Sequence, residues 1–157
     1  MRQEKELKPI GKVSEIELVY RSKVKPSDRP IVKTSRDAFD IFYAHYDPDK
    51  MELVEEFLAM FLNRANKVLG IYKLSSGGLT GTVADPRLLF AAAIKLGACS
   101  IILCHNHPSQ NRQASKADIE LTQKTKQGAD LLDLKLLDHL IITKTEGYRS
   151  MMDEGEI

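Results

Sequence analysis

A short, β-branched apolar run, "CSIILC" at residues 99–104, stands between two segments of helical pattern. A run of this length that ends in a loop is typical of a strand at the centre of a sheet. Residues 134–144, "LKLLDHLIITK", follow the second helical segment and predict another strand. Helices placed between strands cover the faces of a sheet, so this order favours an α/β fold.

Both helical segments carry residues that begin and end helices. In residues 85–97, Asp85 can cap the N-terminus, Pro86 takes the first helical position and Gly97 provides the C-terminal stop. The second segment, residues 115–132, begins with a serine, which is a favourable N-cap residue. We therefore predict a helix over each segment.

The first half of the chain predicts further elements of the same layered fold. Residues 14–22, "SEIELVYRS", alternate with the period of a half-buried strand, and residues 34–47 begin with capping residues and predict a short helix. Two apolar runs at 53–62 and 68–74, joined by "NRANK", predict a β-hairpin. The full order of elements indicates one α/β sandwich with a mixed sheet flanked by helices.

Length and composition set limits on the class of protein. The 157 residues suit a single domain, and the charged, aperiodic residues 1–12 predict a flexible leader before a domain over 13–157. The 23 Lys and Arg against 22 Asp and Glu give a net charge of +1. A nucleic-acid partner stays open as a local patch, but the whole chain lacks the basic footprint of a duplex-binding protein.

Cysteine usage and hydropathy indicate the compartment. Cys99 and Cys104 are the two cysteines, and they lack the paired spacing of a zinc ribbon or a disulfide framework. No run approaches the roughly 20 apolar residues that cross a bilayer. We therefore expect a cytoplasmic protein with no membrane partner, and no signal sets its oligomeric state.

Two histidines follow the run 99–104, where the predicted strand turns into a loop. His105 and His107 can aim both imidazoles at one point, and Pro108 stiffens the turn that presents them. Zinc binds such nitrogens at about 2.0–2.1 Å, and a catalytic zinc takes three protein ligands plus water. Asp118 is the natural third ligand, so these residues predict a zinc site.

Each half of this pattern also has a structural interpretation. Ser115 and Asp118 form "S-x-x-D", which is a capping pair at a helix N-terminus, and an isolated "H-x-H" is often a pair of polar loop residues. Independent local causes seldom assemble a strand end, "HNHP", a loop and "S-x-x-D" in one place. The conjunction therefore favours the metal site over the separate structural roles.

The same residues carry a family resemblance. "HNHP", six further residues and then "SKAD" are similar to the H-x-H-P, S-x-x-D signature of JAB/MPN metalloenzymes, and the surrounding chain resembles their RadC-like branch. The segments that resemble RadC domains, in the same order, are "EEFLAMFLNRANKVLG", "SSGGLTGTVADPRLLFAAAIKLGA" and "LLDHLIIT". The resemblance implies a cytidine-deaminase-like α/β sandwich, with a metal-binding core over 50–157 and a strand-and-helix extension over 13–49.

The resemblance also implies roles for individual residues. His105, His107 and Asp118 would bind Zn²⁺, Ser115 would help stabilise the oxyanion, and an upstream glutamate would hold the attacking water. Glu55 and its neighbour in "VEEF" are both candidates, and because adjacent strand residues face opposite sides, periodicity does not choose between them. The family pattern E-x-F selects Glu55 over Glu56.

A site of this kind hydrolyses an amide, so the resemblance implies a zinc-dependent peptidase or isopeptidase acting on a peptide or a protein conjugate. The alternative is a DNA-repair or mobile-element-associated module without hydrolytic activity, although residues 1–49 do not resemble the helix-hairpin-helix region that usually begins RadC proteins. A deaminase is disfavoured, because its "P-C-x-x-C" and "H-x-E" ligands are absent. Gln110 and Ala114 stand where relatives commonly have glycine and proline, which bears on the loop conformation.

For three further residues and one segment, we expect roles outside the metal site. We expect His139 to be a buried, hydrogen-bonded histidine, His45 to lie on the surface and Cys104 to be a small buried thiol. The glycine-rich residues 75–81 lack a lysine at P-loop spacing and predict a turn or a substrate-contacting loop.

Overall fold

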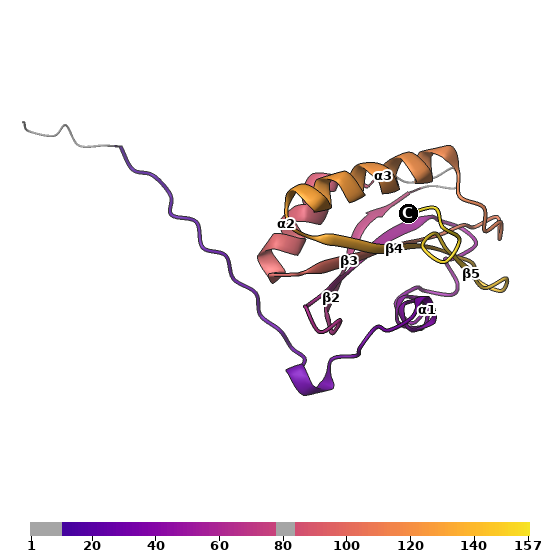
Figure 1. The fold of residues 1–157 in the computed structure, drawn as a ribbon, viewed down its shortest axis with the longest axis horizontal. Helices are drawn as coiled ribbons and strands as arrows, with labels where there is room; N and C mark the ends of the chain where they lie inside the picture. The colour runs from indigo at the N-terminus through magenta and orange to yellow at the C-terminus, as the bar shows by residue number, and fades with distance from the viewer. Residues whose placement is uncertain (1–10, 78–83) are drawn as a thin grey trace, which may run out of the picture.

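The computed structural model describes residues 11–77 and 84–157. Within these ranges, a five-stranded sheet in the order β2-β1-β3-β4-β5 lies between helices on both of its faces (Figure 1). The strands are β1 (Glu56–Leu62), β2 (Val68–Ser76), β3 (Ser100–Asn106), β4 (Lys135–Ile142) and β5 (Tyr148–Ser150). The helices are α1 (Ser35–Tyr43), α2 (Pro86–Leu96) and α3 (Lys116–Leu131), preceded by a 3₁₀ turn at Pro26–Asp28.

The sheet is mixed, as the sequence predicts. Strand β1 runs antiparallel to both β2 and β3, whereas β3 and β4 are parallel and are joined by the crossover helix α3. Strand β5 adds an antiparallel edge to β4. The predicted α/β class is confirmed, and the hairpin, the two later strands and all three predicted helices are present near their expected bounds.

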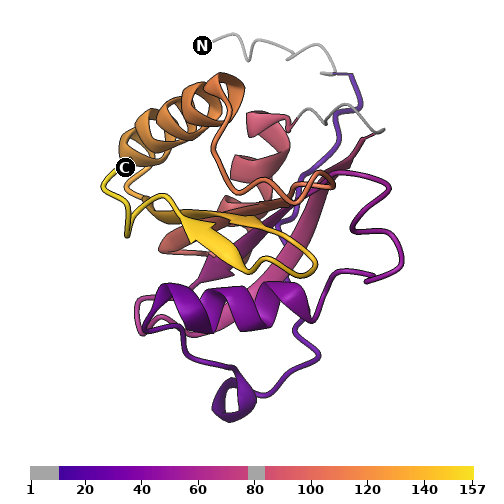
Figure 2. The same ribbon diagram turned by 90° about the vertical axis from the view of Figure 1, so that its right-hand side faces the viewer.

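Strand β1 is buried on both faces, which explains its nearly continuous apolar sequence. Its even-numbered apolar residues pack against α1, and its odd-numbered ones pack against α2 and α3. Figure 2 shows the same layers from the side, with α1 on one face of the sheet and α2 and α3 on the other. Two cores therefore lie back to back, and adjacent β1 residues belong to different ones.

Helix termini form at the residues that the sequence marks. The Asp85 carboxylate accepts from the backbone N–H of Arg87 at the start of α2, and Gly97 ends that helix with a left-handed φ of 62°. Helix α1 begins with a capping box between Thr34 and Asp37. Each cap satisfies backbone groups that the helix itself leaves without partners.

The strand predicted at residues 14–22 is wrong. Residues 11–22 have no regular secondary structure, and Ile16 and Leu18 are 89% and 69% exposed. Figure 1 shows this segment running away from the body of the protein. Alternation gives a segment one apolar face, but a strand also needs a neighbouring strand to pair with its backbone groups. Within the described residues, no strand pairs with this segment.

Two other expectations fall partly outside the described residues. The predicted leader, residues 1–12, is described only at its last two positions, and the glycine-rich residues 75–81 are described only through Gly77.

The three-residue strand β5 was not predicted, because so short a segment has no detectable period. Among the described residues, no helix combines the length and the apolar character needed to cross a membrane.

Candidate metal centre

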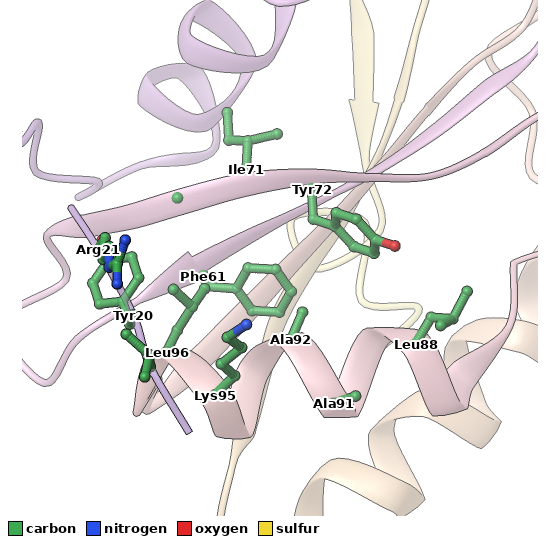
Figure 3. Close-up of a pocket in the computed structure, with 12 residues that line it drawn as sticks. Tyr20, Arg21, Phe61, Ile71, Tyr72, Leu88, Ala91, Ala92, Lys95 and Leu96 are labelled. Atoms are coloured by element: carbon green, nitrogen blue, oxygen red, sulfur yellow. The ribbon is translucent and has the colours of Figure 1, made fainter. Parts of the chain in front are cut away.

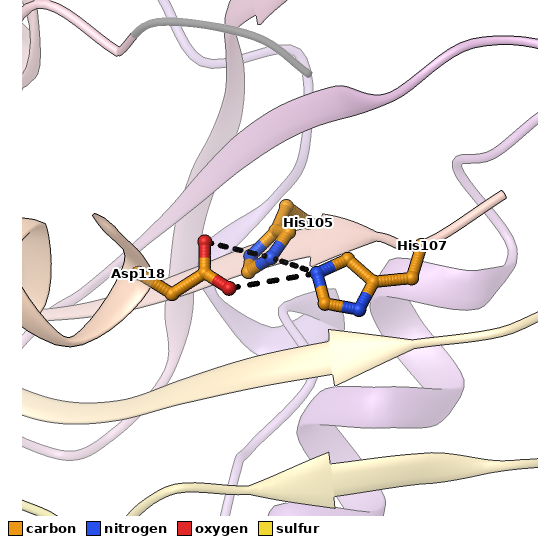
Figure 4. A group of neighbouring side chains, drawn as sticks. All are labelled: His105, His107 and Asp118. Carbon is orange, nitrogen blue, oxygen red and sulfur yellow. Dashed lines mark hydrogen bonds and ion pairs between the residues drawn. The ribbon is translucent and has the colours of Figure 1, made fainter. Parts of the chain in front are cut away.

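The three predicted metal ligands meet at one end of the parallel pair β3 and β4. His105 is the penultimate residue of β3, and its ring stacks on Phe57 of β1 with centroids 5.5 Å apart. His107 follows the strand, and its backbone N–H donates to Ile142 of β4. Asp118 lies in the first turn of α3, so the β3–α3 connection brings its carboxylate to both imidazoles (Figure 4).

The ligand atoms form a small triangle. The Nε2 atoms of His105 and His107 are 2.9 Å apart, and the two Asp118 oxygens lie 3.3 Å from His105 Nε2 and 3.5 Å from His107 Nε2. In a tetrahedral zinc site with bonds of about 2.0–2.1 Å, adjacent ligand atoms are about 3.3 Å apart. The triangle therefore has the size that a zinc ion requires, and these residues fit the group that the resemblance implies.

Hydrogen bonding fixes which nitrogen of His107 faces the triangle as an acceptor. Its Nδ1 lies 2.6 Å from the carbonyl oxygen of Asn111. A carbonyl only accepts, so Nδ1 carries the hydrogen and Nε2 of the neutral ring carries the lone pair. An imidazole lone pair and a carboxylate then point at one position, which is the arrangement that a cation stabilises.

The electrostatics of the cluster agree with this. Burial raises the pKa of Asp118, but its contacts with the imidazoles of His105 and His107 and the hydrogen bond from the Ser115 backbone outweigh burial and hold that pKa well below its usual range. Burial also lowers the pKa of His107, yet the protonated ring can donate to both Asp118 and Asn111, and these bonds together with the nearby charges of Asp118 and Glu55 leave that pKa raised. The cluster keeps its carboxylate ionised and attracts positive charge.

Ser115 and Asp118 also form the capping box that the structural interpretation predicts. Ser115 Oγ accepts from the Asp118 backbone N–H at 3.1 Å, and Asp118 Oδ2 accepts from the Ser115 backbone N–H at 2.7 Å. The same Oδ2 faces His107. The two interpretations are therefore compatible, because the cap holds the carboxylate in the orientation that a metal ligand needs.

The two candidate glutamates lie in different environments. Glu55 directly precedes β1, is partly buried, and lines a hollow of about 360 Å³ together with His107, Pro108 and Ser115. Glu56 is 7% exposed, and its carboxylate bonds Lys73 of β2 at 2.8 Å. The structure brings Glu55, and not Glu56, to the hollow beside the histidines.

Asn106, the residue between the two histidines, was given no role from the sequence. It is fully buried, and its side-chain amide donates to the carbonyls of Met51 and Val54 while its Oδ1 accepts from the Glu56 N–H. These bonds hold the segment that carries Glu55 against β3. A polar amide between two ligands at the end of an apolar strand was the signal that could have found it.

Gln110 stands where the family resemblance leads us to expect glycine, and its backbone has a conformation that suits glycine. Its φ is 65°, in the left-handed region that glycine enters without steric cost. Its side-chain oxygen accepts from the backbone N–H of Thr145 at 3.2 Å. The loop therefore keeps a glycine-type conformation, and a tie to the β4–β5 connection supports it.

The remaining chemistry-bearing side chains lie where we expected. His139 is fully buried and hydrogen-bonded, and His45 is exposed with its Nδ1 beside the Ile41 carbonyl. Cys104 is fully buried on the α1 side of the sheet, away from the His105 ring, and burial raises the pKa of its thiol well above the usual range. A buried, protonated thiol on the other face is not a ligand of this cluster.

A second hollow lies apart from the clustered histidines. It has a volume of about 800 Å³, lies between β2 and α2, and is lined mainly by apolar side chains such as Phe61, Tyr72 and Leu96 (Figure 3). Tyr20 closes one end, and its hydroxyl donates to the Leu69 carbonyl at 2.6 Å. None of the clustered ligands lines it.

The chain is similar to several UPF0758 proteins. A UPF0758 protein of Flavobacterium johnsoniae is 43% identical over 152 residues, which cover 96% of this chain and 64% of the relative. A UPF0758 protein of Porphyromonas gingivalis is 44% identical over 101 residues, covering 64% of this chain and 44% of the relative. One of Syntrophotalea carbinolica is 32% identical over 158 residues, covering 95% and 67%.

These relatives are longer than the chain, which spans between 44% and 67% of their lengths. The sequence profile of the RadC-like JAB domain matches residues 32–156, which include the strands and α-helices of the described residues and the cluster of His105, His107 and Asp118. The match begins after the exposed segment at 11–22. The chain therefore belongs to the RadC-like JAB domain family.

Proposed function

We propose that this protein is a zinc-dependent metallohydrolase that cleaves an amide bond in a peptide or a protein conjugate. The observation that carries the proposal is the convergence of His105, His107 and Asp118 on one position, beside a hollow that His107 and Glu55 both line. Three protein ligands beside open space match a catalytic zinc site, whereas a structural site is closed by a fourth.

A zinc ion in this triangle would supply a Lewis acid and lower the pKa of a coordinated water toward 7. Glu55 lies in the hollow as a carboxylate that takes the proton of the attacking water and delivers it to the leaving amine. The amine leaves as a neutral molecule once it has received that proton. Glu55 thus acts twice, first as the general base and then as the general acid.

Ser115 lines the same hollow and would donate its hydroxyl hydrogen to the oxyanion. Its Oγ already accepts from the Asp118 N–H, which leaves the hydroxyl hydrogen available on the side of the hollow that Ser115 lines. A fixed donor aimed at the developing negative charge lowers the barrier of acyl transfer. The side chains of Ser109 and Asn111 around the hollow are exposed, which suits an extended peptide or a conjugated tail.

Metal analysis and hydrolysis together test the proposal. Purified protein stripped with chelator and incubated with Zn²⁺ should take up one ion per chain, and the His107→Ala and Asp118→Ala variants should take up far less. The zinc-loaded protein should cleave members of a panel of peptides and isopeptide-linked conjugates, and the stripped protein should not. Absence of stoichiometric zinc, or equal binding by His107→Ala, would overturn the site; zinc without cleavage would overturn the hydrolase.

A further inference from the structure

A line of hydrogen bonds leaves the metal cluster through the buried side of His105. Its Nδ1 lies 2.8 Å from Nε2 of His139, and Nδ1 of His139 lies 2.6 Å from Oγ1 of Thr122. The Thr122 hydroxyl in turn lies 2.6 Å from the backbone carbonyl of Asp118. The line therefore begins at one candidate ligand, crosses from β3 to β4 to α3, and ends at the backbone of another.

The last group in the line sets the direction of every bond before it. The Asp118 carbonyl only accepts, so Thr122 donates to it, and Thr122 Oγ1 is left to accept from Nδ1–H of His139. A neutral imidazole with its hydrogen on Nδ1 has a lone pair on Nε2, which accepts from Nδ1–H of His105. His105 is then left with its lone pair on Nε2, the atom that faces His107 and Asp118.

The opposite direction would remove a ligand. If Thr122 donated to His139, the hydrogen of His139 would lie on Nε2, and His105 would have to accept it on Nδ1. The hydrogen of His105 would then occupy Nε2 and point into the ligand triangle. The direction of the line therefore decides whether His105 can bind a cation. A second neighbour of Thr122 Oγ1, the Met151 sulfur at 3.6 Å, is also an acceptor and does not reverse it.

The line is enclosed by protein. His139 and Thr122 are 0% and 2% exposed, and Phe57 packs against both the His105 and His139 rings. The nearest acid in sequence, Asp138, turns away: its carboxylate accepts from the Ser150 hydroxyl and from the backbone N–H groups of His139 and Met152. The His139 ring is therefore oriented by a hydroxyl and a backbone carbonyl, and neither His139 nor Thr122 lines the substrate hollow.

We propose that His139 and Thr122 are positioning residues of the metal centre, which hold His105 in the tautomer whose Nε2 binds zinc. This inference rests on the proposed metal site and adds to it a buried support that ties two ligands together through one hydrogen-bond line. Groups that orient a ligating histidine typically change metal affinity by about 10–100-fold when they are removed. They act through His105 and touch neither the substrate nor the reacting atoms.

Zinc affinity, measured by competition with a chromogenic chelator, tests the inference without any substrate. Thr122→Val removes the hydroxyl at nearly constant volume and should weaken zinc binding about 10–100-fold, whereas Thr122→Ser keeps the hydroxyl and should bind like the parent. His139→Phe should weaken binding similarly. Thr125→Val is the matched control: Thr125 is 1% exposed on the same helix, and its hydroxyl has no hydrogen-bond partner within the described residues, so its loss should leave zinc affinity unchanged.

The tautomer itself is read on the parent protein, so the inference does not depend on any variant folding. Nitrogen chemical shifts of the ¹⁵N-labelled, zinc-free protein should show His139 with its hydrogen on Nδ1 and a lone pair on Nε2. The reverse assignment would overturn the inference, as would a Thr122→Val variant that binds zinc as tightly as Thr125→Val. A parent protein that binds no zinc would instead overturn the proposed function, so the two failures are distinguishable.

Discussion

Asp118 contributes to three parts of the structure at once. Its carboxylate caps α3 and faces both histidines, and its carbonyl accepts from Thr122. A short acidic side chain in the first turn can fill these roles because the backbone N–H groups of that turn lack partners within the helix and attract a carboxylate to the helix N-terminus. The chemistry of single residues therefore has to be separated from their structural roles by matched variants.

The two adjacent glutamates form the first matched pair. Glu55→Gln keeps the shape but loses the proton acceptor, and with a substrate from the hydrolysis panel it should cost about 10²–10⁴ in rate. Glu56→Gln should be nearly silent in rate, because that carboxylate bonds Lys73 away from the hollow. Steady-state rates with zinc content measured in both variants check this. If Glu56→Gln were inactive while retaining zinc, Glu56 and not Glu55 would be the base.

The capping box at Thr34 of α1 provides a control that separates the catalytic role of Ser115 from its capping role. Ser115→Ala and Thr34→Ala each remove an N-cap hydroxyl that accepts from a backbone N–H, so each should cost about 1 kcal/mol in free energy of unfolding. Only Ser115→Ala should also slow hydrolysis, by about 10²-fold if the hydroxyl donates to the oxyanion. Denaturant unfolding and rates of both variants measure the difference. Equal rates for the two would remove Ser115 from the chemistry.

At the level of elements, the ring of Phe90 on α2 packs against the backbone of α3 at Gly128. A Cβ built on Gly128 of α3 would lie 2.8 Å from the ring of Phe90 on α2, closer than real Cβ contacts. Glycine inside a helix ordinarily costs up to about 1 kcal/mol relative to alanine. Its presence here indicates that the helix–helix contact outweighs that local preference.

Gly128→Ala should therefore lower the melting temperature, although alanine is the better helix former. The added methyl group must push the Phe90 ring out of its packing, and overpacking of this kind typically costs about 1–3 kcal/mol. Phe90→Leu combined with Gly128→Ala should recover part of the loss, because the smaller side chain leaves room for the methyl group. Calorimetry of the single and double variants checks the coupling, and a Gly128→Ala protein more stable than the parent would show that the ring moves freely.

At the level of the whole molecule, the exposed segment at 11–22 and the body of the domain are nearly independent. Ile16 and Leu18 are largely exposed, and the Tyr20 hydroxyl joins this segment to the body by donating to the Leu69 carbonyl. Removal of residues 1–19 should therefore leave the melting temperature within about 2 °C and the zinc content unchanged, since a surface change away from packed groups is worth about 0.5 kcal/mol. A large drop, or a change of oligomeric state by light scattering, would show that the segment pairs with another chain.

The balanced charge of the chain bears on the alternative nucleic-acid function. With a net charge of +1, contact with duplex DNA should release few counterions. We expect no submicromolar binding to generic duplex at physiological ionic strength, measured by fluorescence anisotropy across a salt series. Tight binding with a steep dependence on the logarithm of salt concentration would favour the nucleic-acid function over the hydrolase.

Local signals were enough to predict most of the fold and the meeting of the three candidate ligands. The helices at 35–43, 86–96 and 116–131 begin at capping residues, and the hairpin and central strands follow short apolar runs, because these preferences act within a few residues. The clustering of His105, His107 and Asp118 was also predictable, since a strand end and a helix start hold them through one short connection.

Only the tertiary structure decided what depends on distant partners. The pattern at 14–22 has the right period for a strand, but pairing needs a neighbouring backbone, and the segment lies exposed without one. Periodicity assigned Glu55 and Glu56 to opposite faces, and the position of β3, β2 and the metal loop determined which face meets the histidines. The line from His105 through His139 and Thr122 joins three elements that are separated in sequence, so no local pattern could contain it.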